Sequence, residues 1–257
     1  MFIDTHSHLY LENFKDDIDI VVSNAINSNV QKIFLPNIDK ESIEDMLLLE
    51  SRYPHIFHSM LGLHPGSVKS DFIDEIDLLK SYFDTNKFIA IGEVGIDLYW
   101  DKSFKNEQIE AFEIQIDLAI DNNLPIVIHT RESMDLTIDI LKNRNNDKIK
   151  GIFHCFIGDI NQARKVIELG FMMGIGGVVT YKNSILPPVI EHFPIDYMVL
   201  ETDSPFLPPT PYRGKRNESS YIPIIANKIA ELKNIDIKII ENTTTKNALE
   251  LFSLNEL

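Results

Sequence analysis

The chain shows two alternating hydrophobic patterns. Short apolar runs, such as residues 87–92 (KFIAIG), alternate with longer segments in which apolar residues recur every three or four positions, such as residues 72–83. The first pattern is typical of buried strands, and the second is typical of helices that cover a core with one face. The strand-then-helix order repeats from residue 2 to about residue 232, which indicates an α/β fold.

Eight strand patterns are predicted, each followed by a helix pattern. The predicted strands end at His6, Pro36, His64, Glu93, His129, His154, Gly176 and Asp203. The steps between these ends are 30, 28, 29, 36, 25, 22 and 27 residues. Eight βα units of such regular length close into a (β/α)8 TIM barrel. A doubly wound open sheet is the alternative, but no Gly-rich phosphate loop follows the first strand.

The predicted barrel accounts for most of the chain. We expect residues 1–257 to form a single domain, because no linker or low-complexity segment interrupts the pattern. Residues 235–257 are predicted to form a short helical C-terminal tail of one or two helices, with residues 242–244 (NTT) as a cap between them.

Composition narrows the functional classes. The formal net charge of −15 argues against a protein that coats nucleic acid or anionic membrane by general electrostatics, although a local cationic site is compatible with it. The single Cys155 cannot form an internal disulfide, and we expect it to be a small buried residue facing the helix layer. With no signal-peptide pattern and no apolar run long enough to span a bilayer, a cytoplasmic location is expected. Nothing indicates a membrane or an obligate protein partner.

Ionisable side chains gather where the predicted strands end. Active sites of TIM barrels lie at the carboxyl ends of their strands, so residues at these positions are expected to converge. The candidate metal ligands are His6, His8, Glu93, His129, His154 and Asp203. His6 and His8 share one face of the first strand, and Asp4 is expected to orient one of the two imidazoles as an acceptor behind it.

Four histidines and two carboxylates exceed what one tetrahedral ion needs. They suit two divalent ions about 3.5–4 Å apart with Glu93 as the bridge, and Mg, Mn or Zn are the expected metals. Such ions activate a water as nucleophile, and Asp203 is expected to ligate one ion and to act as general base. A serine hydrolase is disfavoured because no Gly-X-Ser-X-Gly motif is present.

Seven short segments together resemble the TatD-type metal-dependent deoxyribonucleases, a family of amidohydrolase-like barrels. They are residues 2–8 (FIDTHSH), 62–65 (GLHP), 92–97 (GEVGID), 125–131 (PIVIHTR), 154–156 (HCF), 201–205 (ETDSP) and 211–217 (PYRGKRN). The resemblance implies the same six metal ligands. It also implies hydrolysis of DNA phosphodiester bonds, often exonucleolytic, with a divalent cation.

DNA as a substrate requires positive groups near an acidic site. Arg131 and Arg213 are the first candidates for phosphate contacts, with Lys215 and His64 beside them, because the planar guanidinium matches phosphate geometry. Each arginine could instead pair with a rim carboxylate. Tyr99 and Trp100 could stack on a base, although packing in a lid or core is favoured for them.

Two other functions remain open. The same metal-activated water could hydrolyse a small amide, lactone or ester, including an aminoacyl-tRNA ester. No lysine stands at a predicted strand end to bridge two metals, which favours the nuclease-like branch with Glu93 as the bridge. A non-catalytic nucleic-acid-binding module is the third class, and the complete ligand set and the acidic charge both disfavour it.

Overall fold

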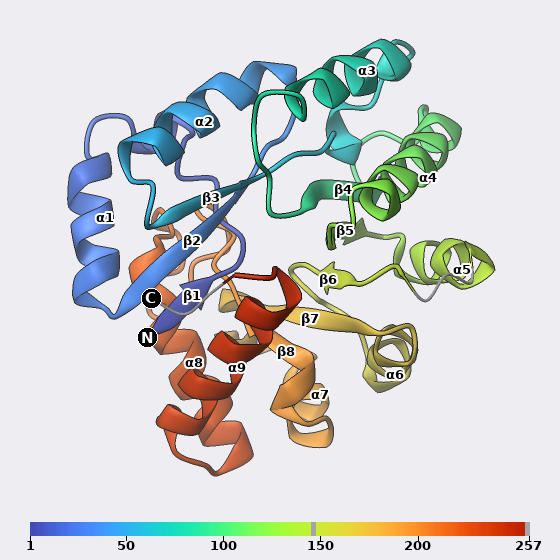
Figure 1. Ribbon diagram of the computed structural model, residues 1–257. Coiled ribbons are helices and arrows are strands. Elements are labelled where there is room, and N and C mark those ends of the chain that lie inside the picture. Colours follow the sequence, from blue (N-terminus) through green and yellow to red (C-terminus); the bar gives the residue numbers. More distant parts are fainter. Residues whose placement is uncertain (145–147, 255–257) are drawn as a thin grey trace.

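The computed structural model describes residues 1–144 and 148–254, and in this part eight parallel strands surround a central axis (Figure 1). The strands are β1 (Phe2–Asp4), β2 (Val30–Pro36), β3 (Phe57–Met60), β4 (Ile91–Asp97), β5 (Ile126–Arg131), β6 (Gly151–Phe153), β7 (Phe171–Ile175) and β8 (Met198–Leu200). Each pairs with its sequence neighbours, in the ladders β1-β2-β3 and β4-β5-β6-β7-β8.

The two ladders are joined at both seams. At one seam a parallel bridge links Leu61 to Ile91, and at the other a parallel bridge links Ser7 to Ser204. The Thr5 amide also donates to the Leu200 carbonyl oxygen at 3.0 Å. The strands therefore complete a ring, and the predicted (β/α)8 barrel is confirmed.

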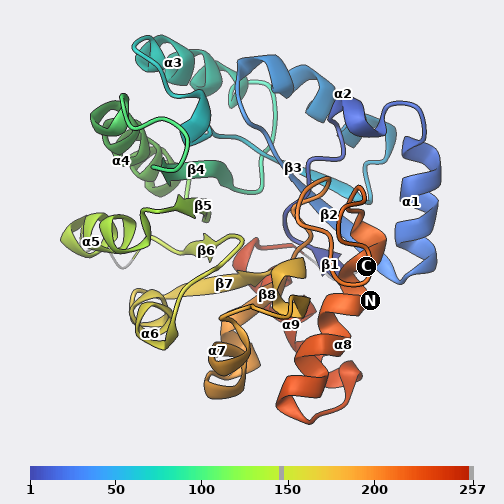
Figure 2. The same ribbon diagram turned by 180° about the vertical axis from the view of Figure 1, so that it is seen from behind.

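Helices cover the outside of the ring (Figures 1 and 2). They are α1 (Ile18–Asn27), α2 (Ile43–Arg52), α3 (Phe72–Tyr82), α4 (Lys105–Asp121), α5 (Met134–Arg144), α6 (Ile160–Glu168), α7 (Pro187–His192) and α8 (Ile222–Lys233); the last helix is α9 (Ile237–Leu251). Each outer helix buries its apolar stripe against the strands; α1, for example, buries Val21, Val22 and Ala25. No helix in the two described ranges combines the length and the apolar character needed to cross a bilayer.

The last helix, α9, covers one end of the barrel (Figure 1). Its residues Ala248, Leu249 and Leu251, with the following Phe252, pack against side chains that point into the barrel, and the Phe252 ring lies 4.6 Å from that of Phe34. The opposite end carries the long loop after β8, seen from behind in Figure 2. The fold therefore leaves the carboxyl ends of the strands for chemistry.

The predicted break in the tail is wrong, because α9 is one continuous helix. Its N-terminal cap is Asp236, whose side chain accepts from the Lys238 amide, and residues 242–244 lie inside the helix. The Thr244 hydroxyl donates to the Ile240 carbonyl oxygen at 2.8 Å, which satisfies it within the helix.

Two strands extend further than the apolar runs indicated. Strand β4 begins at Ile91 and continues to Asp97, so Glu93 lies inside it rather than after it. Strand β5 likewise continues through His129 to Arg131. Gly95 explains the extension, since a Cβ there would lie 2.2 Å from the His129 carbonyl oxygen. Only glycine lets the two strands stay paired through these polar residues.

Candidate metal centre

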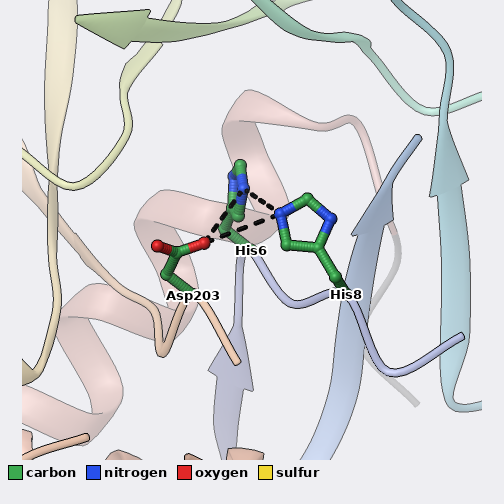
Figure 3. A group of neighbouring side chains, drawn as sticks. All are labelled: His6, His8 and Asp203. Atoms are coloured by element: carbon green, nitrogen blue, oxygen red, sulfur yellow. Dashed lines mark hydrogen bonds and ion pairs between the residues drawn. The ribbon is translucent and has the colours of Figure 1, made fainter. Parts of the chain in front are cut away.

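The first group of site residues forms where β1 meets the loop after β8. His6 and His8 follow β1 and turn their Nε2 atoms to within 3.3 Å of each other. Asp203 Oδ1 lies 3.8 Å from His6 Nε2 and 3.6 Å from His8 Nε2 (Figure 3). The three side chains converge on one point from two segments that are adjacent only because the barrel closes.

Glu93 joins this group to a second one. Its Oε2 lies 3.1 Å from His6 Nε2 and 3.4 Å from His8 Nε2. Its Oε1 lies 2.8 Å from His129 Nδ1 and 2.9 Å from His154 Nε2. Each carboxylate oxygen therefore faces a different pair of imidazoles. The six residues predicted as ligands all lie within this one cluster.

The donor set fits divalent cations. Ring nitrogens face each other at 3.3 Å between His6 and His8, and at 3.4 Å between His129 and His154. Two neutral imidazoles that turn lone pairs toward each other repel, and a cation between them relieves this repulsion. Histidine nitrogens with carboxylate oxygens are the mixed donors typical of Zn and Mn sites.

The remaining ring nitrogen of His8 is held by a residue that the sequence reasoning missed. His8 Nδ1 lies 2.9 Å from the Tyr10 hydroxyl, which donates to the Pro36 carbonyl oxygen at 2.6 Å. Because the tyrosine proton is committed to Pro36, the hydroxyl must accept from Nδ1–H. In the neutral ring, the Nε2 atom of His8 is then the unprotonated nitrogen, and it faces the cluster.

Two buried carboxylates support the second pair of histidines and were also missed. Asp97 Oδ2 lies 3.1 Å from His129 Nε2, which leaves Nδ1 of that ring for the cluster. Glu201 Oε1 lies 3.5 Å from His154 Nδ1 and accepts the Cys155 amide. Both residues stand in the segments GEVGID and ETDSP. Their place in these motifs was the available signal.

His64 lies next to the cluster but is bonded differently. Its Nδ1 accepts from the Gly66 amide at 2.9 Å, so in the neutral ring the proton is on Nε2. That Nε2 lies 3.5 Å from Glu93 Oε1. Burial lowers the pKa of His64, despite the opposing effect of Glu93, which favours this neutral form. His64 therefore presents an N–H donor to the site rather than a lone pair.

Asp4 does not orient an imidazole, so that expectation is wrong. Its carboxylate accepts from the Thr202 amide at 2.9 Å and from the Thr202 hydroxyl at 2.6 Å. Strand β1 ends at Asp4, and the chain turns before His6, so the assumed alternation does not continue. Asp4 instead fixes the backbone just before Asp203, which adopts a left-handed conformation with φ 57°.

The cluster is buried and strongly polarised. Glu93 is 3% exposed, and burial alone would raise its pKa, but His154, His6 and His64 hold that pKa well below its usual range. Burial opposes the charged form of His8, yet Asp203 and Glu93 raise its pKa to about 9. The same kind of balance raises the pKa of His154, with Glu93 and Glu201 outweighing burial. Such a site stabilises positive charge.

Arginines at the rim of the site contact aromatic rings. The Arg131 guanidinium carbon lies 3.8 Å from the centre of the Tyr99 ring, and that of Arg213 lies 4.2 Å from the centre of the Tyr181 ring. Lys215 Nζ lies 5.8 Å from the Tyr212 ring. Among described residues, neither Arg131 nor Arg213 forms an ion pair with a carboxylate, so the alternative of rim ion pairs is wrong for both.

Two further expectations need correction. For Tyr99 and Trp100, the sequence favours packing in a lid or in the core; their exposures of 49% and 77% exclude the core. Cys155 follows the end of β6, so strand alternation does not direct it to the helix layer, and it is partly exposed. Burial raises the pKa of its thiol, and the nearby carboxylates of Asp203, Glu201 and Glu93 raise it further. The thiol therefore stays protonated beside the site.

A (β/α)8 barrel with histidines and carboxylates converging at its strand ends has the architecture of a metal-dependent hydrolase. The family described as TatD related DNase matches residues 3–253. The chain belongs to the TatD family, as its sequence motifs indicated, and it is a metal-dependent hydrolase.

Relatives and solved structures agree with this membership. The uncharacterized metal-dependent hydrolase YabD of Bacillus subtilis (strain 168) is 38% identical over 256 residues, covering 99% of this chain and 100% of the relative. YjjV, a TatD homolog from Escherichia coli K12, superposes with a TM-score of 0.92 at 29% identity, covering 99% of this chain and 98% of that one. A TatD family hydrolase from Entamoeba histolytica, at 23% identity and a TM-score of 0.84 over 97% of each chain, shares the fold.

Proposed function

We propose that this protein is a deoxyribonuclease that cleaves DNA phosphodiester bonds with two divalent ions, acting as an exonuclease from an end of the DNA chain. One observation carries the proposal: the two oxygens of Glu93 face separate pairs of imidazoles, at 3.1 and 3.4 Å on one side and at 2.8 and 2.9 Å on the other. A carboxylate in this position suits a bridge between two ions, the arrangement used for in-line displacement at phosphorus.

The donors divide between the two ions. His6, His8 and Asp203 would hold one ion. His129 and His154, whose facing ring nitrogens lie 3.4 Å apart and beside Glu93 Oε1, would hold the other. Mg, Mn or Zn suit these donors. When bound, such ions activate a water and stabilise the charge that develops on the phosphate and the leaving oxygen.

The residues of the chain supply the remaining steps. Asp203 has a side chain 15% exposed, more than the buried Glu93, so it is placed to accept a proton from the attacking water as general base. The His64 Nε2–H is available to a substrate oxygen. Arg131, Arg213 and Lys215 can hold the flanking phosphates, because none of the three forms an ion pair with a carboxylate among the described residues.

The assay compares substrate classes on one preparation. Purified protein is incubated with single-stranded DNA plus Mg or Mn, beside a panel of small amides, lactones and esters and an aminoacyl-tRNA. We expect metal-stimulated release of nucleotides from DNA. Turnover of an amide or ester without DNA cleavage would refute the nuclease assignment.

Variants test the assigned roles. Asp203→Asn should abolish turnover with an unchanged circular dichroism spectrum, whereas Asp196→Asn, an exposed carboxylate, should retain wild-type rates. Metal analysis of His6→Ala should show lost or halved occupancy, with His192→Ala as the matched exposed histidine. Unchanged metal stoichiometry in His6→Ala would remove that residue from the ligand set.

A further inference from the structure

The loop after β4 presents an aromatic pair, Tyr99 and Trp100, to solvent. The two rings meet edge to face, with centres 4.8 Å apart and planes at 87°. Trp100 is 77% exposed. Indole is the largest aromatic side chain, and leaving it in water forgoes the stabilisation that burial would give. Such exposure at the mouth of a site is typical of a surface that receives a ligand.

We propose that the aromatic pair and Arg131 form a stacking subsite for a nucleobase next to the bond that is cleaved. The inference rests on the proposed nuclease function and deepens it. It assigns Trp100 as the platform for the base. Arg131 takes the adjoining phosphate.

The subsite is fixed relative to the metal cluster. Asp97 Oδ1 accepts from the Tyr99 amide at 2.9 Å, and Asp97 Oδ2 lies 3.1 Å from His129 Nε2. The Leu98 amide also donates to the Arg131 carbonyl oxygen at 2.9 Å. One carboxylate thus contacts both a candidate ligand and the start of the aromatic pair. The platform is held in place rather than carried on a free loop.

The chemistry of the subsite selects its ligand. The Arg131 guanidinium lies with its carbon 3.8 Å from the Tyr99 ring centre and 5.2 Å from that of Trp100. A guanidinium over a ring face keeps its N–H edge available for an anion. A ligand that satisfies both groups combines a planar ring with a neighbouring phosphate, as a nucleotide does.

The chain offers a direct reporter, because Trp100 is its one tryptophan. Tryptophan fluorescence of the whole protein therefore reports on this ring alone. The probes are deoxyadenosine monophosphate and deoxyribose 5-phosphate, which carry the same phosphate with and without a base. We expect saturable quenching by the nucleotide and little change with the sugar phosphate.

Affinity measured by calorimetry then tests the role of the ring. Trp100→Ala should lower the ratio of nucleotide affinity to sugar-phosphate affinity by roughly 10-fold or more, and Trp100→Phe should recover part of it. The matched control is Tyr197→Ala. Tyr197 is also an exposed aromatic residue, but it precedes β8 and so lies at the other end of the barrel, and its removal should leave the ratio at the wild-type value.

The outcomes separate the subsite from the proposed function. Equal affinity of the wild-type protein for the two probes, or an unchanged ratio in Trp100→Ala, overturns the subsite even if DNA is cleaved. Base-selective binding that is lost in Trp100→Ala supports the subsite even if the preferred reaction proves to be on an amide or ester.

Discussion

Gly174 in β7 leaves space for the carboxylate that supports His154, and Gly174→Ala would fill that space. A Cβ at this position would lie 2.2 Å from Glu201 Oε2, 2.8 Å from Glu201 Cδ and 3.2 Å from the His154 Cα. Ordinary van der Waals contact begins at 3.4 Å, so the carboxylate must move by more than 1 Å. Glu201 is fully buried and has little room to do so.

Two costs add in Gly174→Ala. Overpacking a close-packed interior costs about 1–3 kcal/mol. If Glu201 moves away, the Cys155 amide loses its acceptor, and an unsatisfied buried donor costs about 1–3 kcal/mol more. We therefore expect the free energy of unfolding to fall by about 2–6 kcal/mol. Because Glu201 also supports His154, Mn affinity should fall by about 10-fold.

Urea unfolding in a chelator measures the stability, and calorimetry measures the Mn affinity. Gly176→Ala is the matched control, since its Cβ would lie no nearer than 3.7 Å to any neighbouring atom and would also face Glu201. Adding Glu201→Ala should remove the clash, so the double mutant should show a favourable coupling of about 1–3 kcal/mol.

A small effect would contradict this reasoning. If Gly174→Ala stays within about 0.5 kcal/mol of Gly176→Ala and binds Mn normally, Glu201 does not occupy the space beside Gly174. A clash without coupling to Glu201→Ala would assign the cost to the His154 backbone instead.

Three further predictions concern the barrel and its cations. Phe252→Ala removes a buried ring that packs on Phe34, so it should lower the free energy of unfolding by about 3–5 kcal/mol in urea titrations. The control is Ile239→Ala near the start of α9, where the side chain is 48% exposed, and its free energy of unfolding should stay within about 0.5 kcal/mol of the wild-type value. Burial raises the pKa of Asp4 from 3.8 to about 7, despite its hydrogen bonds to Thr202. The stabilising contribution of protonated Asp4 is therefore complete below pH 3.8 and is lost as the pH rises through about 7. Asp4→Asn should flatten this part of the stability–pH profile, and an unchanged slope would contradict the raised pKa of Asp4. Added Mn should raise the free energy of unfolding by about 2.7 kcal/mol at a hundredfold excess over its Kd. If Mn raises the Tm of His6→Ala as much as that of the wild-type protein, the ion does not bind at this cluster.

The ring of strands and the cluster were predictable for the same reason. Six of the eight predicted strands end at a histidine or a carboxylate, and a parallel barrel brings all strand ends to one rim. The prediction placed His129 and Glu93 in the cluster correctly, although β4 and β5 continue past them. It required only that both residues lie near the carboxyl ends of their strands.

The supporting residues were not predictable in this way. Tyr10 acts through the Pro36 carbonyl, and Asp4 acts on Thr202, so each depends on a partner far along the chain. Whether Arg131 pairs with a carboxylate or packs on the Tyr99 ring depends on the path of the loop after β4. Local periodicity contains no information on such contacts, which tertiary packing alone decides.

The seam between β1 and β8 determines when the cluster is completed during folding. His6 and Asp203 are separated by 197 residues, and the Asp203 amide donates to the His6 carbonyl oxygen at 2.9 Å only when first and last strands meet. Contacts between such distant segments form late, because the long intervening chain must first be ordered. During synthesis the N-terminal histidines leave the ribosome long before their carboxylate partner. A nascent chain therefore acquires a complete ion site only at the last step of barrel closure. Ion binding during folding would therefore report when the barrel closes.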